Sequence, residues 1–148
     1  MKVMVLGIGN PILTDDGIGI KIAREIAKER PGIDVEEVSE AGLAFLDHAI
    51  GYDRLIIVDS IKTGRGRVGE LYKLELDDLQ PSDDFPSSHG LDMASVLKLA
   101  GDLGYKRPDI SIYAVEVKDN TTFSEQCTVE IEGKISSFAQ QVIAEEKL

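Results

Sequence analysis

The chain has 148 residues, of which 43% are hydrophobic and 29% charged, and its formal net charge is −11. This length fits one domain, residues 1–148, with enough apolar residues for one sizeable core. The negative charge argues against nucleic acid and anionic membranes as partners, because both require a basic contact surface. No apolar run approaches the roughly 18 residues of a membrane span, and no signal-peptide pattern is present. The single cysteine, Cys127, cannot form an internal disulfide, so we expect a cytoplasmic protein.

Along the chain, patterns typical of strands alternate with patterns typical of helices. Short apolar or alternating runs predict strands, and apolar residues at helical spacing predict helices. The expected strands are 2–8, 33–38, 54–59, 68–76 and 108–117, and the expected helices are 17–30, 43–50, 91–103 and 124–146. A flexible loop is expected at 62–67 and an exposed acidic loop at 77–85. We therefore expect an α/β fold: a three-layer αβα sandwich with a largely parallel, twisted sheet of about five strands and helices on both faces.

The segment from Gly7 to Gly19 joins the first strand to the first helix and carries two acids, Asp15 and Asp16. Gly7 and Gly9 let the chain turn where a side chain would collide. We expect both acids at the carboxyl end of the strand, where open α/β sheets bind their ligands. Taken alone, the pair could also serve only to cap the first helix.

Three polar residues, Asp16, Asp59 and His89, stand at the end of an apolar strand or just before a helix. Successive parallel strands have their carboxyl ends on the same side of a sheet, so the three side chains can converge on one crevice. Two carboxylates and a neutral imidazole suit a divalent transition metal. Each residue also has a plainer role open to it. Asp59 could be a hydrogen-bonded strand-end acid, and His89 could be a surface group beside a helix.

The segment Gly7-Ile-Gly-Asn-Pro-Ile-Leu-Thr-Asp-Asp-Gly-Ile-Gly19 resembles the signature of the hydrogenase maturation endopeptidases. These proteins trim the C-terminus of the large subunit of nickel–iron hydrogenases. The resemblance continues through Leu55-Ile-Ile-Val-Asp-Ser60 and Ser88-His-Gly90. It implies that Asp16, Asp59 and His89 are the metal-binding and catalytic residues. It also implies that the metal is nickel, delivered with a large-subunit precursor that is both substrate and partner.

These observations predict a metal-dependent endopeptidase, an aspartyl-type hydrolase that removes the C-terminal extension of a nickel-loaded precursor. Nickel could polarise the scissile carbonyl or activate water, and Asp16 or Asp59 could act as general base. No serine or cysteine constellation offers a covalent route, and we expect Cys127 to pack within the last helix. Two alternatives remain open: a nucleotide- or nucleoside-handling α/β domain that uses the Gly7–Gly9 turn, and a chaperone that holds the precursor without cutting it.

The turn after the second expected strand differs from the family pattern. Many members have an Asp-Gly-Gly-Thr-like turn there, whereas this chain has Glu40-Ala-Gly-Leu43. Gly42 can supply the positive φ that such a turn often needs. Because Glu40 would lie beside two metal-binding carboxylates, a purely structural role for it is unfavourable. We expect Glu40 and Gly42 to take part in selecting the cognate hydrogenase.

Overall fold

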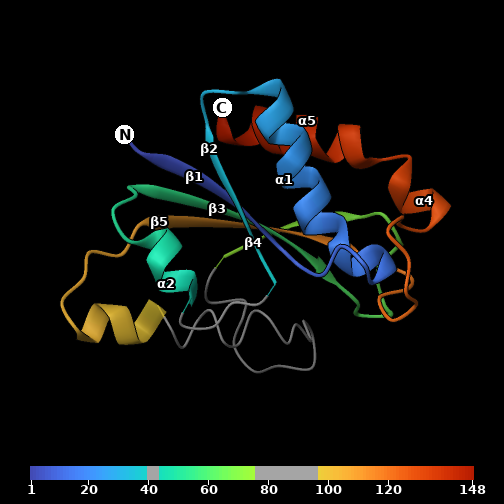
Figure 1. Cartoon of the computed structure of the whole chain (residues 1–148), viewed down its shortest axis with the longest axis horizontal. Coiled ribbons are helices and arrows are strands. Elements are labelled where there is room, and N and C mark those ends of the chain that lie inside the picture. The colour runs from blue at the N-terminus through green and yellow to red at the C-terminus, as the bar shows by residue number, and fades with distance from the viewer. Residues whose placement is uncertain (40–43, 76–96) are drawn as a thin grey trace.

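The computed structural model describes residues 1–39, 44–75 and 97–148, and its centre is a five-stranded sheet with the order β2-β1-β3-β5-β4 (Figure 1). The strands are β1 (Val3–Ile8), β2 (Asp34–Val38), β3 (Arg54–Ile61), β4 (Leu71–Leu74) and β5 (Asp109–Glu116). Strands β2, β1, β3 and β5 run parallel, and β4 pairs with β5 in the antiparallel direction. The largely parallel sheet expected from the sequence is thereby confirmed.

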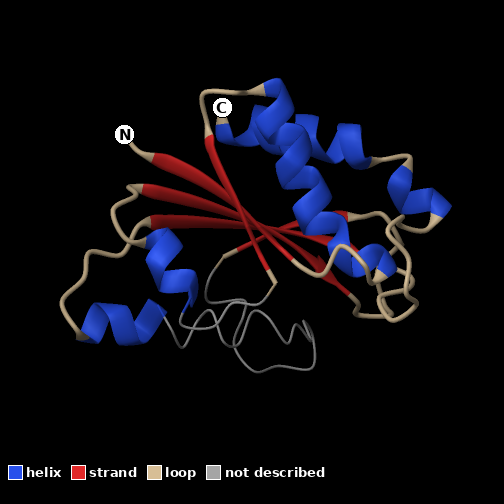
Figure 2. Ribbon diagram, viewed as in Figure 1, coloured by secondary structure: helices blue, strands red, loops and turns tan. Residues whose placement is uncertain are grey.

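Helices cover both faces of this sheet, which makes three layers (Figure 2). The helical elements are η1 (Thr14–Gly17), α1 (Ile18–Glu29), α2 (Ala44–Ala49), α4 (Val129–Glu132) and α5 (Ile135–Glu146), and residues 97–102 are also helical. Helices α1 and α5 pack on one face, and α2 with the helical segment 97–102 lies on the other. The expected αβα sandwich is therefore correct.

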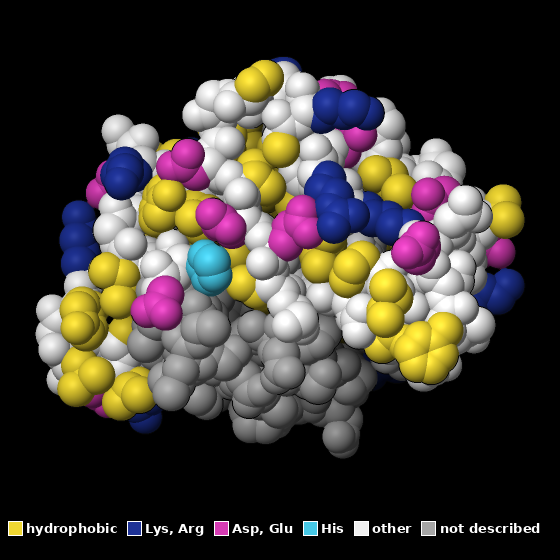
Figure 3. Space-filling model, in the orientation of Figure 1, with side chains coloured by type: hydrophobic (Ala, Val, Ile, Leu, Met, Phe, Trp, Pro, Cys, Tyr) yellow, Lys and Arg dark blue, Asp and Glu magenta, His cyan; other side chains and the backbone are white. Residues whose placement is uncertain are grey.

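Each central strand is buried on both faces because its side chains alternate between two hydrophobic clusters. In β3, Leu55 and Ile57 face α2, whereas Ile56 and Val58 face α1 and α5. Every residue of β3 after Arg54 is buried. Acidic side chains are spread over the face of the molecule shown in Figure 3, in keeping with the net charge of −11. No helix in the described part of the chain is long and apolar enough to cross a membrane.

The structure corrects three predicted boundaries. Strand β3 extends beyond 59 because its pairing with β5 continues to Ile61, whose carbonyl accepts the N–H of Val117 at 2.9 Å. Strand β4 is shorter than 68–76, since the N–H of Glu70 donates to the carbonyl of Arg67 and closes a turn before the strand. The expected helix 124–146 is helical only from Val129 onward and is divided into α4 and α5, and residues 118–128 form a loop.

The end of α5 is tied to the sheet by a buried carboxylate, Glu146. Tyr113 donates a 2.6 Å hydrogen bond to Glu146 Oε2, and Arg54 Nη2 lies 3.0 Å from Oε1. Burial alone would raise the pKa of Glu146, but hydrogen bonds from Tyr113, Ser111 and Arg54 together lower it below its ordinary value. Charged Glu146 therefore stabilises the folded state.

We predict that replacing Glu146 by Gln removes a pH-dependent part of the stability. Because the folded-state pKa of Glu146 is depressed, its contribution is complete above the ordinary value near 4.5 and declines as the pH falls through the folded-state value. Urea unfolding should show a loss of about 1–3 kcal/mol at pH 7 that shrinks below pH 4. An equal loss at both pH values would contradict this assignment, and exposed Glu145→Gln is the matched control.

Candidate functional site

Two glycines allow the first loop to fold tightly against the end of β1. A Cβ on Gly9, whose φ is +150°, would lie 2.0 Å from the carbonyl oxygen of Asp16. A Cβ on Gly19 would lie 2.3 Å from the carbonyl oxygen of Val58 and 2.6 Å from that of Ile8. The N-terminus of α1 therefore sits directly on β1 and β3, and η1 places both acids at the carboxyl edge of the sheet, as predicted. These close approaches explain the glycines without a bound pyrophosphate.

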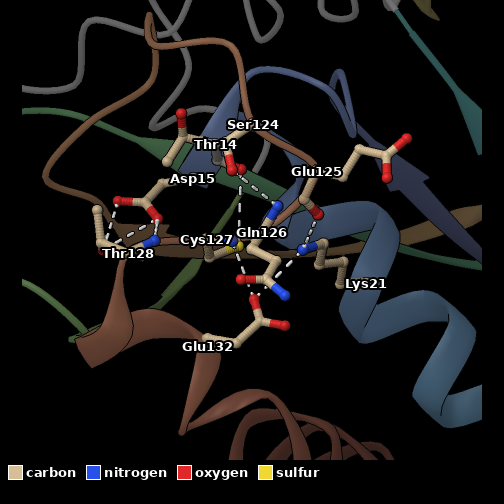
Figure 4. Close-up of polar contacts among 9 residues, drawn as sticks. All are labelled: Thr14, Asp15, Lys21, Ser124, Glu125, Gln126, Cys127, Thr128 and Glu132. Carbon is tan, nitrogen blue, oxygen red and sulfur yellow. Dashed lines mark hydrogen bonds and ion pairs between the residues drawn. The ribbon is translucent and has the colours of Figure 1, made fainter.

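The first acid of the pair, Asp15, is a structural anchor. It is fully buried, and its carboxylate accepts the backbone N–H groups of Lys118, Asp119 and Thr128 at 2.7–3.2 Å. The Thr128 hydroxyl lies 3.0 Å from Oδ2 (Figure 4). Asp15 thereby holds both ends of the loop 118–128 against the first loop. Capping of α1 is excluded as the role of either acid, because the N-cap residue is Gly17 and no side chain caps the helix.

The second acid, Asp16, is partly exposed and lies beside β3. Its Oδ2 accepts the N–H of Asn10 at 2.9 Å, and the hydroxyl of Ser60 donates to its Oδ1 at 3.4 Å. Asp59, which is 5% exposed, accepts the N–H of Ser60 at 2.7 Å through Oδ1. The structure thus brings Asp16 and Asp59 to the two sides of a single residue, Ser60.

Ser60 is a site residue to which sequence reasoning gave no role. It contacts both carboxylates, one through its backbone N–H and the other through its hydroxyl, and it is buried. Its position directly after Asp59 was the signal available in the sequence. Asp16 accepts hydrogen bonds from a backbone N–H and a hydroxyl of the described residues, and both donors are uncharged. Its negative charge therefore remains available to a cation.

The other predicted site residues, His89, Glu40 and Gly42, lie outside the described residues. Among residues 1–39, 44–75 and 97–148 no group of three histidine, cysteine or acidic side chains is placed to hold a metal ion. The three-residue metal site therefore stays a prediction. The last described strand before residues 40–43, β2, ends at Val38 on the same edge as Asp16, because the carbonyl of Val38 accepts the N–H of Gly9 at 3.1 Å.

Cys127 is a core residue, although it precedes α4 rather than lying within a helix. Its sulfur packs 3.6 Å from the carbonyl oxygen of Thr14, and its backbone N–H donates to Glu132 at 2.9 Å (Figure 4). Burial raises the pKa of the thiol to about 12, an effect larger than the opposing influence of the Lys21 ammonium. The thiol is therefore protonated at neutral pH, which supports the packing role and not a nucleophilic one.

We predict that substitutions of the two neighbouring acids lower the stability of the protein by different amounts. Asp15→Ala leaves three partly buried N–H groups without their acceptor and should lower the free energy of unfolding by about 2–4 kcal/mol. Asp16→Asn keeps an acceptor for the N–H of Asn10, and its amide can donate to the Ser60 hydroxyl, so it should cost less than about 1 kcal/mol. Urea denaturation of both variants measures the difference. Similar losses in the two variants would show that Asp15 does not anchor the loop.

The family model, a curated relative and the solved structures that resemble this chain all indicate one family. Residues 20–145 match the family model described as hydrogenase maturation protease. The chain is 27% identical over 151 aligned residues to the hydrogenase 2 maturation protease of Escherichia coli K12, covering 97% of this chain and 90% of that protein. The solved structure of the [NiFe] hydrogenase maturation protease HybD from Thermococcus kodakarensis has a TM-score of 0.81 and 26% identity, with 99% and 98% of the two chains covered.

The fold is also shared with the hydrogenase maturating endopeptidase HybD from Escherichia coli, with a TM-score of 0.82 and 24% identity over 99% of this chain and 93% of that one. The family match spans most of the chain, and the fold agrees with it. The chain therefore belongs to the hydrogenase maturation protease family, whose function is the processing of hydrogenase large-subunit precursors.

Proposed function

We propose that this protein removes the C-terminal extension of a nickel–iron hydrogenase large-subunit precursor and that it recognises nickel already bound to that precursor. Family membership makes the protein a protease of hydrogenase maturation. The observation that supports the proposed metal recognition is the placement of Asp16 and Asp59 on the two sides of Ser60, at the carboxyl edge of the sheet. The precursor and its nickel together form the substrate.

The donor set fits a divalent transition metal. Asp16 and Asp59 offer carboxylate oxygens, and His89 offers an imidazole as the proposed third ligand. The two hydrogen bonds from Asn10 and Ser60 fix the direction of the Asp16 carboxylate without neutralising its charge. Three protein ligands leave coordination positions for groups of the precursor, so we expect the isolated protein to bind metal weakly.

We assign the general base to Asp16, because it is the more accessible of the two carboxylates. Asp59 is 5% exposed, whereas Asp16 is partly exposed and lies in the first loop. A carboxylate held by Asn10 and Ser60 is oriented to take a proton from the attacking water. Nickel, when bound with the precursor, supplies Lewis-acid polarisation. Ser60 then has a positioning role, since it connects Asp16 to the strand that carries Asp59.

The two alternatives have less support. A nucleotide phosphate would lie beside Asp15 and Asp16, and like charges repel. The Gly7–Gly9 turn is accounted for by the contact between α1 and the sheet. A chaperone that holds the precursor without cutting it is opposed by the protease family match. The cytoplasm, where the precursor is made, is the proposed location.

We predict that His89→Ala, Asp16→Asn and Asp59→Asn each reduce processing of a nickel-loaded precursor at least a hundredfold, because Asp16 is the proposed general base and His89 and Asp59 are proposed ligands of the metal. Nickel-free precursor should be cut poorly by the unaltered protein. Mass spectrometry of the precursor after incubation gives the amount cut, and circular dichroism checks folding. Exposed Asp102→Asn is the control. Normal processing by His89→Ala would remove His89 from the proposed site.

A second prediction concerns the choice of hydrogenase. Replacing residues 40–43 with Asp-Gly-Gly-Thr should alter which precursors are cut while leaving metal affinity nearly unchanged. The reason is that β2 ends at Val38, on the same edge of the sheet as Asp16, while residues 40–43 are not among the proposed metal ligands. Competition between two precursors in one reaction, read by mass spectrometry, measures the preference. An unchanged preference would place selection elsewhere in the chain.

A further inference from the structure

The loop 62–70 is held in place by a buried carboxylate that the proposed mechanism does not use. Glu116 of β5 is 1% exposed, accepts the N–H of Thr63 at 2.8 Å and also accepts the Thr63 hydroxyl. Its backbone carbonyl accepts the N–H of Gly69 at 2.8 Å, and its N–H donates to Glu70 at 2.9 Å. The sequence predicted a flexible loop, whereas these bonds fix the backbone at both ends.

A glycine brings the middle of this loop close to the same carboxylate. A Cβ on Gly66 would lie 2.7 Å from Glu116 Oε1 and 1.8 Å from the Tyr72 hydroxyl oxygen. The N–H of Gly66 donates to the Thr63 hydroxyl at 3.2 Å. Arg65 and Arg67, which flank Gly66 in the sequence, are therefore carried on a backbone that is anchored, and both side chains are exposed.

A surface pocket of about 510 Å³ lies between this loop and Lys134, the N-cap residue of α5. It is lined by Arg65, Gly66, Arg67, Gly69, Glu70 and Lys134. Three cations and one acid thus surround it in a chain with a net charge of −11. Neither Arg67 nor Lys134 forms an ion pair with another of the described residues. This cationic pocket therefore differs in charge from the molecule as a whole.

We propose that the cationic pocket binds an acidic segment of the precursor polypeptide, an inference that rests on the proposed function. A guanidinium matches a carboxylate with two parallel hydrogen bonds, and Lys134 adds a point charge. Glu70 also lines the pocket and repels any anion that binds there. This repulsion is stronger for a free anion with several charges than for a polypeptide whose carboxylates carry one charge each. Carboxylate side chains of a protein substrate are thus the chemistry that this pocket fits.

The position of the cationic pocket suits a second contact with the same substrate. The loop leaves the carboxyl end of β3, and Thr63 follows Asp59 by four residues, a span of at most about 14 Å. A precursor bound at Asp16 and Asp59 is therefore within reach of the loop. The pocket adds affinity for the substrate and takes no part in the bond cleavage.

The test uses a double variant, Arg67→Gln with Lys134→Gln, which removes two charges but no backbone anchor. Processing of the nickel-loaded precursor at low ionic strength should show KM raised about fivefold and kcat unchanged, as expected for two exposed charge pairs. The dependence of KM on salt concentration should become weaker. The matched control is Lys98→Gln with Lys147→Gln, which has the same net charge and alters exposed cations outside the pocket. We expect this control to retain the KM of the unaltered protein.

The outcomes separate this inference from the proposed function. Equal KM values for the double variant and its control would overturn the inference while leaving the function intact. If the unaltered protein cuts no precursor, the proposed function fails, and fluorescence anisotropy with labelled precursor still tests the pocket. Weaker binding by the double variant than by its control supports the inference in that case, and equal binding overturns it. The inference would also be overturned by a third result: millimolar inorganic phosphate competes saturably with the precursor, while the double variant keeps the precursor affinity of the unaltered protein.

Discussion

The arrangement of the site depends on one buried charge, the carboxylate of Asp15. A fully buried carboxylate is stable only where hydrogen-bond donors replace the lost water, and here three backbone N–H groups and the Thr128 hydroxyl do so. These donors come from more than 100 residues further along the chain. Asp15 therefore joins the loop after β1 to the loop before α4, and the direction of its neighbour Asp16 follows from that connection.

Most of the sheet could be predicted because buried parallel strands appear in the sequence as short apolar runs. The segment Leu55–Val58 is an example, and the helical spacing that begins at Ile18 is another. The break before α4 could not be predicted, because its cause is the distant Asp15 and not a local signal. The same applies to the loop 62–70, whose glycines and basic residues look flexible in the sequence but are fixed by Glu116. Local patterns identify elements, whereas single buried polar contacts decide the loops.

In the candidate site, too, local patterns in the sequence predict some features and not others. Strand-end position predicted that the Asp15–Asp16 pair and Asp59 lie at one edge of the sheet, and the structure places Asp16 and Asp59 beside Ser60. It was not enough to distinguish Asp15 from Asp16, since adjacent acids in a loop have the same chemistry and differ only in the direction of their side chains. Three glycines of the first motif, Gly7, Gly9 and Gly19, are explained by backbone approaches shorter than 3 Å. The family signature is therefore in large part a description of how α1 packs on the sheet.

The position of Ser60 has a geometric consequence. Side chains alternate along β3, so Asp59 lies on the face covered by α2, and Ser60 points with Asp16 toward the face covered by α1. A ligand that touches both carboxylates must therefore straddle the end of the strand instead of lying along one face. For a polypeptide bound in this way, the parts before and after the contact leave toward different layers of the sandwich. The sheet edge would then act as a divider, with the folded body of a large protein on one side and its tail on the other.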